Sequence, residues 1–191
     1  MMKSIILLYS IMPQLVFHIR LISSKSKSEK IIMNKSQFFK LLISIILPLA
    51  LGAIAGMFTS ESVPEWYATL NRPSFNPHNW IFGPVWTTLY ILMGISLFLI
   101  LKQDASKERK VAILVFLIQL LLNFGWSFIF FYFNMIGFAL VEIILLWFSI
   151  VIMLVLFYKI KPMASYINIP YLLWVSFATV LNASYYLLNR I

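Results

Sequence analysis

Tryptophan, tyrosine and carboxamide side chains recur at helical spacing in three apolar segments of the chain. The three sets are Trp86, Tyr90 and Met93; Gln119, Asn123, Trp126 and Phe130; and Trp174, Ala178, Leu181, Asn182 and Tyr185. Residues three, four and seven positions apart share one face of a helix. Indole and phenol rings stack on flat apolar molecules, so three such faces together would form a cavity for a planar ligand.

The carboxamides in these segments have two interpretations. An amide in hydrocarbon is costly unless it forms hydrogen bonds, so Gln119, Asn123 and Asn182 should point into a helix bundle. Each amide taken alone is explained by a tie between helices, whereas three faces that each carry a tryptophan favour a shared cavity. Ala178 is small and lies between Trp174 and Asn182 in the sequence, which leaves space for a ligand.

The connection over residues 61–81 contains three prolines, several aromatic rings and a cation. Pro64, Pro73 and Pro77 predict a stiff loop folded over the mouth of the bundle. The rings and basic residues of this loop are Trp66, Tyr67, Phe75, Trp80, Arg72 and His78. An aromatic belt at the membrane–water boundary explains about half of the rings. The alternative is a lid that covers a flat apolar ligand, with Arg72 contacting an acidic group of that ligand.

Residue types for conventional catalysis or metal binding are scarce. The chain has no cysteine, which excludes disulfides, thiol nucleophiles and zinc–thiolate sites. His18 and His78 lie outside the apolar segments, so we expect no metal site in the membrane and no required cofactor. Glu142 is the one charged residue within these segments. It is either an acid near the interface that bonds to a neighbouring helix or a proton-coupling group.

The composition identifies the elements that must position these side chains. Of the 191 residues, 62% are hydrophobic and 11% are charged. The long apolar stretches are 41–60, 82–101, 111–133, 136–158 and 164–189. Each is long enough to cross a hydrocarbon core of about 30 Å as a helix. The sequence therefore predicts an all-α polytopic membrane protein with five transmembrane helices. It excludes a soluble enzyme, a disulfide-stapled secreted domain and a nucleic-acid-binding domain.

The basic residues predict the orientation of the five helices. Thirteen of the fifteen lysines and arginines lie on the side of the N-terminus, and the opposite side has only Arg72 and Arg190. Basic residues accumulate on the cytoplasmic side of helical membrane proteins. We therefore expect a cytoplasmic N-terminus and an external C-terminus, with membrane lipid as a partner of the basic side.

Residues 1–32 are interpreted separately from the domain 33–191. The apolar run 5–19 is short for a transmembrane span and contains Pro13, and a polar, basic string follows it. The preferred interpretation is a dispensable extension, with Met33 as a natural start. The alternatives are a sixth span or an interfacial anchor.

Glycines four residues apart occur once in the first span. Gly52 and Gly56 share a helix face and allow another backbone to approach closely. The pair predicts helix association, either between two copies of the chain or inside one bundle.

Four sequence blocks together resemble the TspO/MBR family, whose members include tryptophan-rich sensory proteins, translocator proteins and peripheral-type benzodiazepine receptors. The blocks are WYATLNRPSFNP at 66–77, FGPVWTTLYILMG at 82–94, QLLLNFGW at 119–126 and PYLLWVSFATVLN at 170–182. The resemblance covers about 33–191. It implies five helices, often dimeric, around a cavity that the first loop closes. It also implies porphyrin or haem as ligand, and a location in the bacterial cell membrane.

The resemblance also implies roles for particular residues. Trp86 and Trp174 are similar to the pair that bacterial relatives use in light-dependent porphyrin breakdown. Tyr67, Asn123, Trp126, Ala178 and Leu181 fall on positions that resemble ligand contacts. Phe138 stands where animal members carry a pocket tryptophan, and Phe75 and His78 depart from the pattern of the loop.

The favoured function is therefore a membrane sensor that binds a porphyrin or a similar planar ligand. No acid–base pair or activated nucleophile is visible, so an enzyme would have to act by light-dependent oxidation of the bound porphyrin. Transport of a hydrophobic ligand is the third hypothesis, because no internal repeat is visible.

Overall fold

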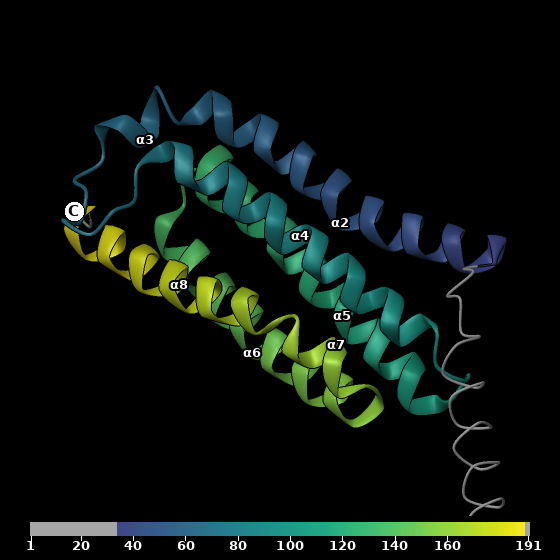
Figure 1. Ribbon diagram of the computed structural model, residues 1–191. Coiled ribbons are helices and arrows are strands. Elements are labelled where there is room, and N and C mark those ends of the chain that lie inside the picture. Colours follow the sequence, from purple (N-terminus) through teal and green to yellow (C-terminus); the bar gives the residue numbers. More distant parts are fainter. Residues whose placement is uncertain (1–33, 190–191) are drawn as a thin grey trace, which may run out of the picture. The chain divides into compact units, whose positions relative to one another are not determined.

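The computed structural model describes residues 34–189 and shows a bundle of five long helices (Figure 1). The long helices are α2 (Lys35–Ser62), α4 (Asn79–Leu101), α5 (Lys107–Ser127), α6 (Ile136–Ile160) and α8 (Ile169–Asn189). The short elements are α3 (Trp66–Thr69), the π-helical turn η1 (Phe128–Tyr132) and α7 (Pro162–Tyr166). There is no strand within residues 34–189. The prediction of an all-α protein with five membrane-spanning helices is confirmed. The interpretation of 1–32 lies outside the described residues.

The helices are long enough to cross a bilayer and extend past the apolar stretches at several ends. The five candidate spans have 23 to 28 residues. At about 1.5 Å per residue even the shortest measures about 34 Å, slightly more than the hydrocarbon core. α5 begins four residues before its apolar run because Ser106 caps it, accepting a hydrogen bond from the Arg109 backbone N–H at 3.1 Å.

The tight connection between α5 and α6 fixes these two helices side by side. Asn134 has a φ of 58°, which is the left-handed conformation that asparagine tolerates better than most residues. The Met135 backbone N–H donates to the Ile129 carbonyl at 3.0 Å and thereby closes the turn. At the far end of the pair, Phe116 and Phe157 stack with their ring centroids 6.2 Å apart.

The solid core occupies the half of the bundle that contains the 102–106 connection and α7. Its fully buried side chains include Met93, Phe116, Ile150, Met153 and Phe157. Figure 1 shows α7 at this end and α3 at the opposite end of the bundle. A second, smaller apolar cluster near α3 contains Tyr67, Phe130 and Tyr185, and this half contains the candidate site.

The fifth span is broken, which differs from the continuous stretch 164–189 expected from the sequence. α7 ends at Tyr166 and α8 begins at Ile169, with Asn168 buried between them. The Asn168 amide donates to the Ser96 hydroxyl at 2.5 Å and to the Ala164 carbonyl at 3.0 Å. The break is stabilised because this amide satisfies local acceptors and ties the chain to α4.

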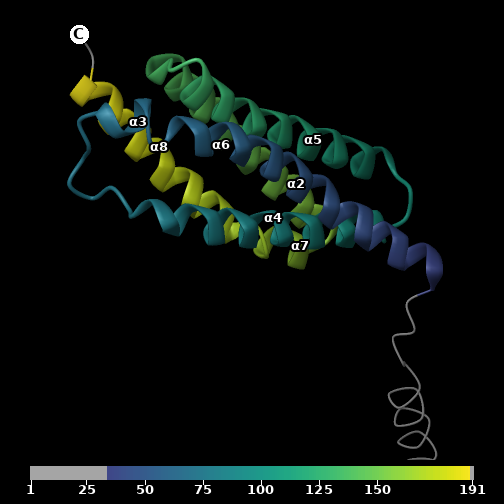
Figure 2. The same cartoon turned by 90° about the horizontal axis from the view of Figure 1, so that it is seen from above.

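Glycine lets α2 and α4 cross closely. A Cβ on Gly94 would lie 2.6 Å from the Ile45 Cα and 2.7 Å from the Ser44 carbonyl oxygen. Both neighbours are backbone atoms, so any side chain at Gly94 would push the two helices apart. α2 runs alongside α4 and α5 in both views (Figures 1 and 2). This helix forms one wall of the hollow half of the bundle.

Candidate functional site

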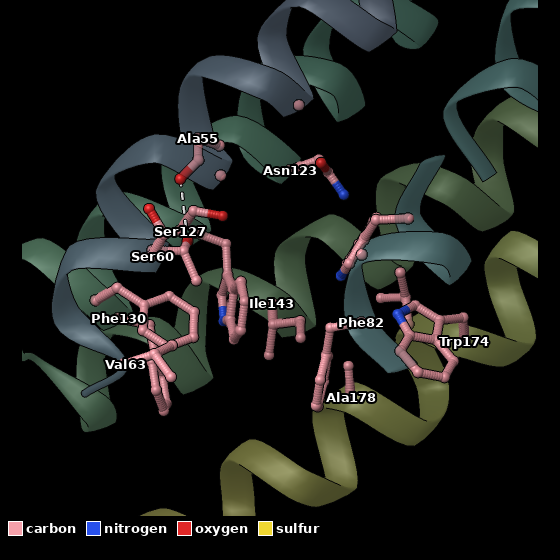
Figure 3. A pocket seen from close by; sticks show the side chains of 18 of the residues that line it. Ala55, Ser60, Val63, Phe82, Asn123, Ser127, Phe130, Ile143, Trp174 and Ala178 are labelled. Atoms are coloured by element: carbon pink, nitrogen blue, oxygen red, sulfur yellow. Dashed lines mark hydrogen bonds between the residues drawn. The ribbon is translucent and has the colours of Figure 1, made fainter. Parts of the chain in front are cut away.

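A pocket of about 750 Å³ lies within the hollow half of the bundle (Figure 3). Residues of α2, α3, α4, α5, η1, α6 and α8 line it. Nine aromatic side chains contribute to the lining: Tyr67, Phe82, Trp86, Tyr90, Trp126, Phe130, Phe131, Trp174 and Tyr185. Small-molecule sites typically measure about 300–1,000 Å³ and are mostly apolar with a few placed polar groups. This pocket has that size and that chemistry.

The structure brings most of the residues singled out in the sequence to this pocket. Of the twelve residues on the three faces, together with Tyr67 and Phe138, eleven line it: Tyr67, Trp86, Tyr90, Asn123, Trp126, Phe130, Trp174, Ala178, Leu181, Asn182 and Tyr185. Met93, Gln119 and Phe138 do not line it, and neither does Arg72. Three helical faces that the spacing identified therefore converge on one space.

A chain of hydrogen bonds joins the pocket wall to the buried core. The Tyr90 hydroxyl donates to the Asn123 Oδ1 at 2.8 Å, and the Asn123 amide donates to the Tyr171 hydroxyl at 3.2 Å. The Tyr171 hydroxyl in turn donates to the Gln119 Oε1 at 2.8 Å. Gln119 is fully buried behind the wall, so it orients Tyr171 and does not reach the pocket.

Asn182 fixes one of the pocket indoles. The Trp126 indole N–H donates to the Asn182 Oδ1 at 3.0 Å, and the Asn182 amide donates to the Ile136 carbonyl at 3.1 Å. The Trp126 ring stacks on Phe130 with 5.2 Å between the centroids. One carboxamide thus links α5, α6 and α8 and holds a flat ring in a single orientation at the wall.

The other two pocket tryptophans are held by ring packing. Trp86 stacks on Tyr90 at 5.5 Å, with an angle of 27° between the rings. Trp174 meets Phe82 edge to face at 5.9 Å. The indole N–H of Trp174 is buried and has no hydrogen-bond partner among the residues that the structure describes. In Figure 3, Phe82, Trp174 and Ala178 lie together at the α4 and α8 side of the pocket.

A polar cluster at the mouth closes the pocket near α3. The Tyr67 hydroxyl donates to the Asn76 Oδ1 at 3.1 Å, and the Tyr185 hydroxyl donates to the Tyr67 hydroxyl at 2.7 Å. The Arg72 guanidinium carbon lies 5.3 Å from the centre of the Tyr67 ring, within cation–π range. Burial raises the pKa of Tyr67 above its usual value of 10, so the phenol stays protonated and donates at neutral pH.

Hydrogen bonds between asparagines attach the loop to the end of α8. The Asn71 backbone N–H donates to the Asn189 Oδ1 at 2.8 Å, and the Asn189 amide donates to the Asn71 carbonyl at 3.0 Å. The aromatic rings of the loop do not all support the same interpretation, a lid or an aromatic belt. Tyr67 turns into the pocket, whereas Trp80 is 74% exposed and does not line it. Trp80 therefore fits the aromatic belt, and Tyr67 fits the lid.

Phe138 and Glu142 show which face of α6 is turned inward. Phe138 is 71% exposed, because Ala139, Glu142 and Ile143 occupy the inner face of the helix. Glu142 is 8% exposed, and both carboxyl oxygens lack a hydrogen-bond partner among residues 34–189. No group of three or more histidine, cysteine or acidic residues that could hold a metal occurs in this part of the chain.

α2 contributes lining residues that the helical spacing did not identify. They are mostly small: Leu49, Gly52, Ala53, Ala55, Gly56, Thr59 and Ser60. Gly52 faces the Tyr90 ring of the same chain, and a Cβ there would overlap that ring. Gly56 borders open pocket space. The glycine pair was the feature of the sequence that could have indicated this wall. In this bundle the pair makes room for an aromatic wall and for the pocket.

Comparisons with known proteins agree with this architecture. The TspO/MBR family model matches residues 44–187. The tryptophan-rich protein TspO of Chlorobaculum tepidum is 43% identical over 158 residues, which cover 82% of this chain and 99% of that protein. The human translocator protein is 37% identical over 136 residues, 70% of this chain and 80% of that protein. The tryptophan-rich sensory protein of Cereibacter sphaeroides is 31% identical over 118 residues, 62% of this chain and 73% of that protein. Five membrane-spanning helices and these matches over most of the chain lead to one assignment: the chain belongs to the TspO/MBR family of integral membrane proteins.

Proposed function

We propose that this membrane protein is a sensor or translocator-like protein that takes a planar tetrapyrrole, such as a porphyrin, into the pocket. The observation that supports the proposal is the convergence of Trp86, Trp126 and Trp174 on one apolar space of about 750 Å³. Stacking of a flat ring on an aromatic side chain adds about 0.5–1.5 kcal/mol beyond simple burial. Several such contacts favour a flat macrocycle over a compact aliphatic molecule.

The mouth supplies a group for the acidic edge of the ligand. Arg72 lies over Tyr67, which lines the pocket. A guanidinium binds a carboxylate through two parallel hydrogen bonds. A porphyrin with its macrocycle among the indoles would place its propionates near Arg72.

Titration with protoporphyrin in the dark tests this proposal. We expect quenching of tryptophan fluorescence with a micromolar or tighter Kd, since a ligand in the pocket would touch three of the six tryptophans. Haem and a sterol, titrated in the same detergent, show whether the site selects planar tetrapyrroles. Free tryptophan amide at equal absorbance corrects for light absorbed by the ligand. Quenching no greater than in that control would contradict the proposal.

Two other activities remain as alternatives for the same pocket. Trp86 and Trp174 both line it, which favours light-dependent degradation of a bound porphyrin as the second candidate. Transport of porphyrins or other small hydrophobic ligands is the third. Accumulation of porphyrin inside sealed vesicles that contain the protein would support transport.

We propose that the basic connections face the cytoplasm and the loop with Arg72 faces outward. The absence of cysteine allows a direct measurement with single cysteines at Lys107 and Ser74. In right-side-out vesicles, a membrane-impermeant maleimide should label Ser74→Cys nearly completely and Lys107→Cys only after the membrane is permeabilised. The reverse pattern would invert the orientation.

A further inference from the structure

A second hollow lies on the outer face of the bundle, between α4 and α8. This groove measures about 570 Å³, and its walls include Pro84, Thr88 and Leu92 of α4 and Leu173 and Phe177 of α8. These residues belong to the spans Asn79–Leu101 and Pro162–Asn189, so the groove opens toward lipid tails. Trp174 lines both the groove and the internal pocket. This indole therefore lies between the two hollows.

The seam between α4 and α8 is held by apolar contacts. Within residues 34–189 no hydrogen bond joins these two helices; the interhelical bonds of α4 go to Asn123 and Gln119 on α5, and to Ala164 and Asn168 at the α7 end. The ring contacts across the seam are Phe82 with Trp174 at 5.9 Å and Trp86 with Tyr171 at 6.4 Å. In a bilayer, separating apolar helix surfaces has no hydrophobic penalty because lipid tails replace the lost contacts.

Trp174 differs from two other partly buried tryptophans in how it is held. The indole N–H of Trp126 donates to Asn182, and that of Trp147 donates to the Ser176 hydroxyl at 2.8 Å. The Trp174 N–H is buried without a partner in the described chain. A change of the Trp174 rotamer therefore breaks packing contacts but no hydrogen bond.

The mouth of the pocket is held by polar contacts instead. Opening it requires breaking the Asn71–Asn189 hydrogen bonds together with the bonds among Tyr67, Asn76 and Tyr185. The seam is the easier route for a hydrophobic molecule that already resides in the membrane.

We propose that the groove is a lateral port through which a planar hydrophobic ligand passes from the bilayer into the pocket, with Trp174 as the movable partition. This inference rests on the proposed function, because it assumes that the pocket takes such a ligand. The groove is the outer binding surface of the port, and its apolar walls suit the ring system of the ligand. The mouth stays closed around the acidic edge.

Covalent tethers distinguish the two routes. The full chain is placed in lipid nanodiscs with two introduced cysteines, either Thr88→Cys with Leu173→Cys across the seam or Asn71→Cys with Asn189→Cys across the mouth. A bismaleimide linker closes each pair, and each variant is compared before and after linking. Stopped-flow quenching with protoporphyrin in the dark gives the association and dissociation rate constants.

Linking across the seam should lower both rate constants at least about tenfold and leave the Kd within about twofold, because a blocked route slows both directions equally. Linking across the mouth should leave both rate constants within about twofold. Unchanged rates after linking the seam would overturn the lateral port, and so would an equal slowing by the mouth tether. If the parent chain binds no protoporphyrin in the dark, the proposed function fails, and the port fails with it.

Discussion

Replacing Ala178 by phenylalanine should weaken dark binding of protoporphyrin at least about 100-fold. Ala178 lines the pocket on the α8 face that also carries Trp174 and Leu181. A phenyl group at this position would extend into the space that a macrocycle must occupy, because Ala178 borders that space directly. A 100-fold loss corresponds to about 2.8 kcal/mol, at about 1.4 kcal/mol for each factor of ten. The measurement is the Kd from tryptophan quenching in the dark.

The matched control is Ala183→Phe on the same helix. Ala183 does not line the pocket, and the substitution adds the same ring. Its Kd should stay within about threefold of the parent value, and circular dichroism should show equal helix content in both variants. If the two variants bind equally well, porphyrin does not occupy this pocket.

The fold was predictable because each span carries its own signal. A helix in a membrane satisfies all its backbone groups internally, so length and hydropathy alone identified the five segments. Length and hydropathy do not show a break in a helix that a polar residue stabilises. The break before Ile169 depends on Asn168 reaching Ser96 on another helix, and that contact is visible only in three dimensions.

The pocket was only partly predictable. Helical spacing tells which face of a helix a residue lies on, but it does not tell whether that face borders a cavity or a packed core. The helical spacing placed Trp86 and Tyr90 on one face and Asn123 and Trp126 on another, and all four side chains line the pocket. Gln119 shares the face of Asn123 one turn away, yet it lies where the core is solid. The position of Gln119 along the helix axis decides whether its side chain faces the pocket or a buried tyrosine.

Two other parts of the site had no periodic signal. Phe131 lines the pocket beside Phe130, which the helical spacing did identify, because the π-helical turn η1 departs from the 3.6-residue repeat. The α2 wall consists largely of small residues. These residues contribute to the pocket by leaving space, and they form no recognisable pattern in the sequence. Phe138 points outward because the inner face of α6 is set by neighbouring helices.

Replacing both Trp86 and Trp174 by phenylalanine should lower the light-dependent loss of bound protoporphyrin absorbance at least about tenfold. Both indoles line the pocket, so an excited macrocycle there would have an oxidisable ring beside it. Phenylalanine keeps an aromatic face for stacking but is much harder to oxidise, so binding should change less than the light reaction. The measurement is the first-order decay of porphyrin absorbance in air, at equal bound fraction, with a parallel sample in the dark.

The control for this experiment is Trp147→Phe. Trp147 does not line the pocket, and its indole N–H bonds to Ser176 on α8. This variant should degrade porphyrin at the parental rate, which separates a role of the pocket indoles from general oxidation of tryptophan. Equal decay in all three proteins would identify the loss as ordinary photobleaching. The pocket would then act in binding alone, and the degradation alternative would be wrong while the proposed sensor function would stand.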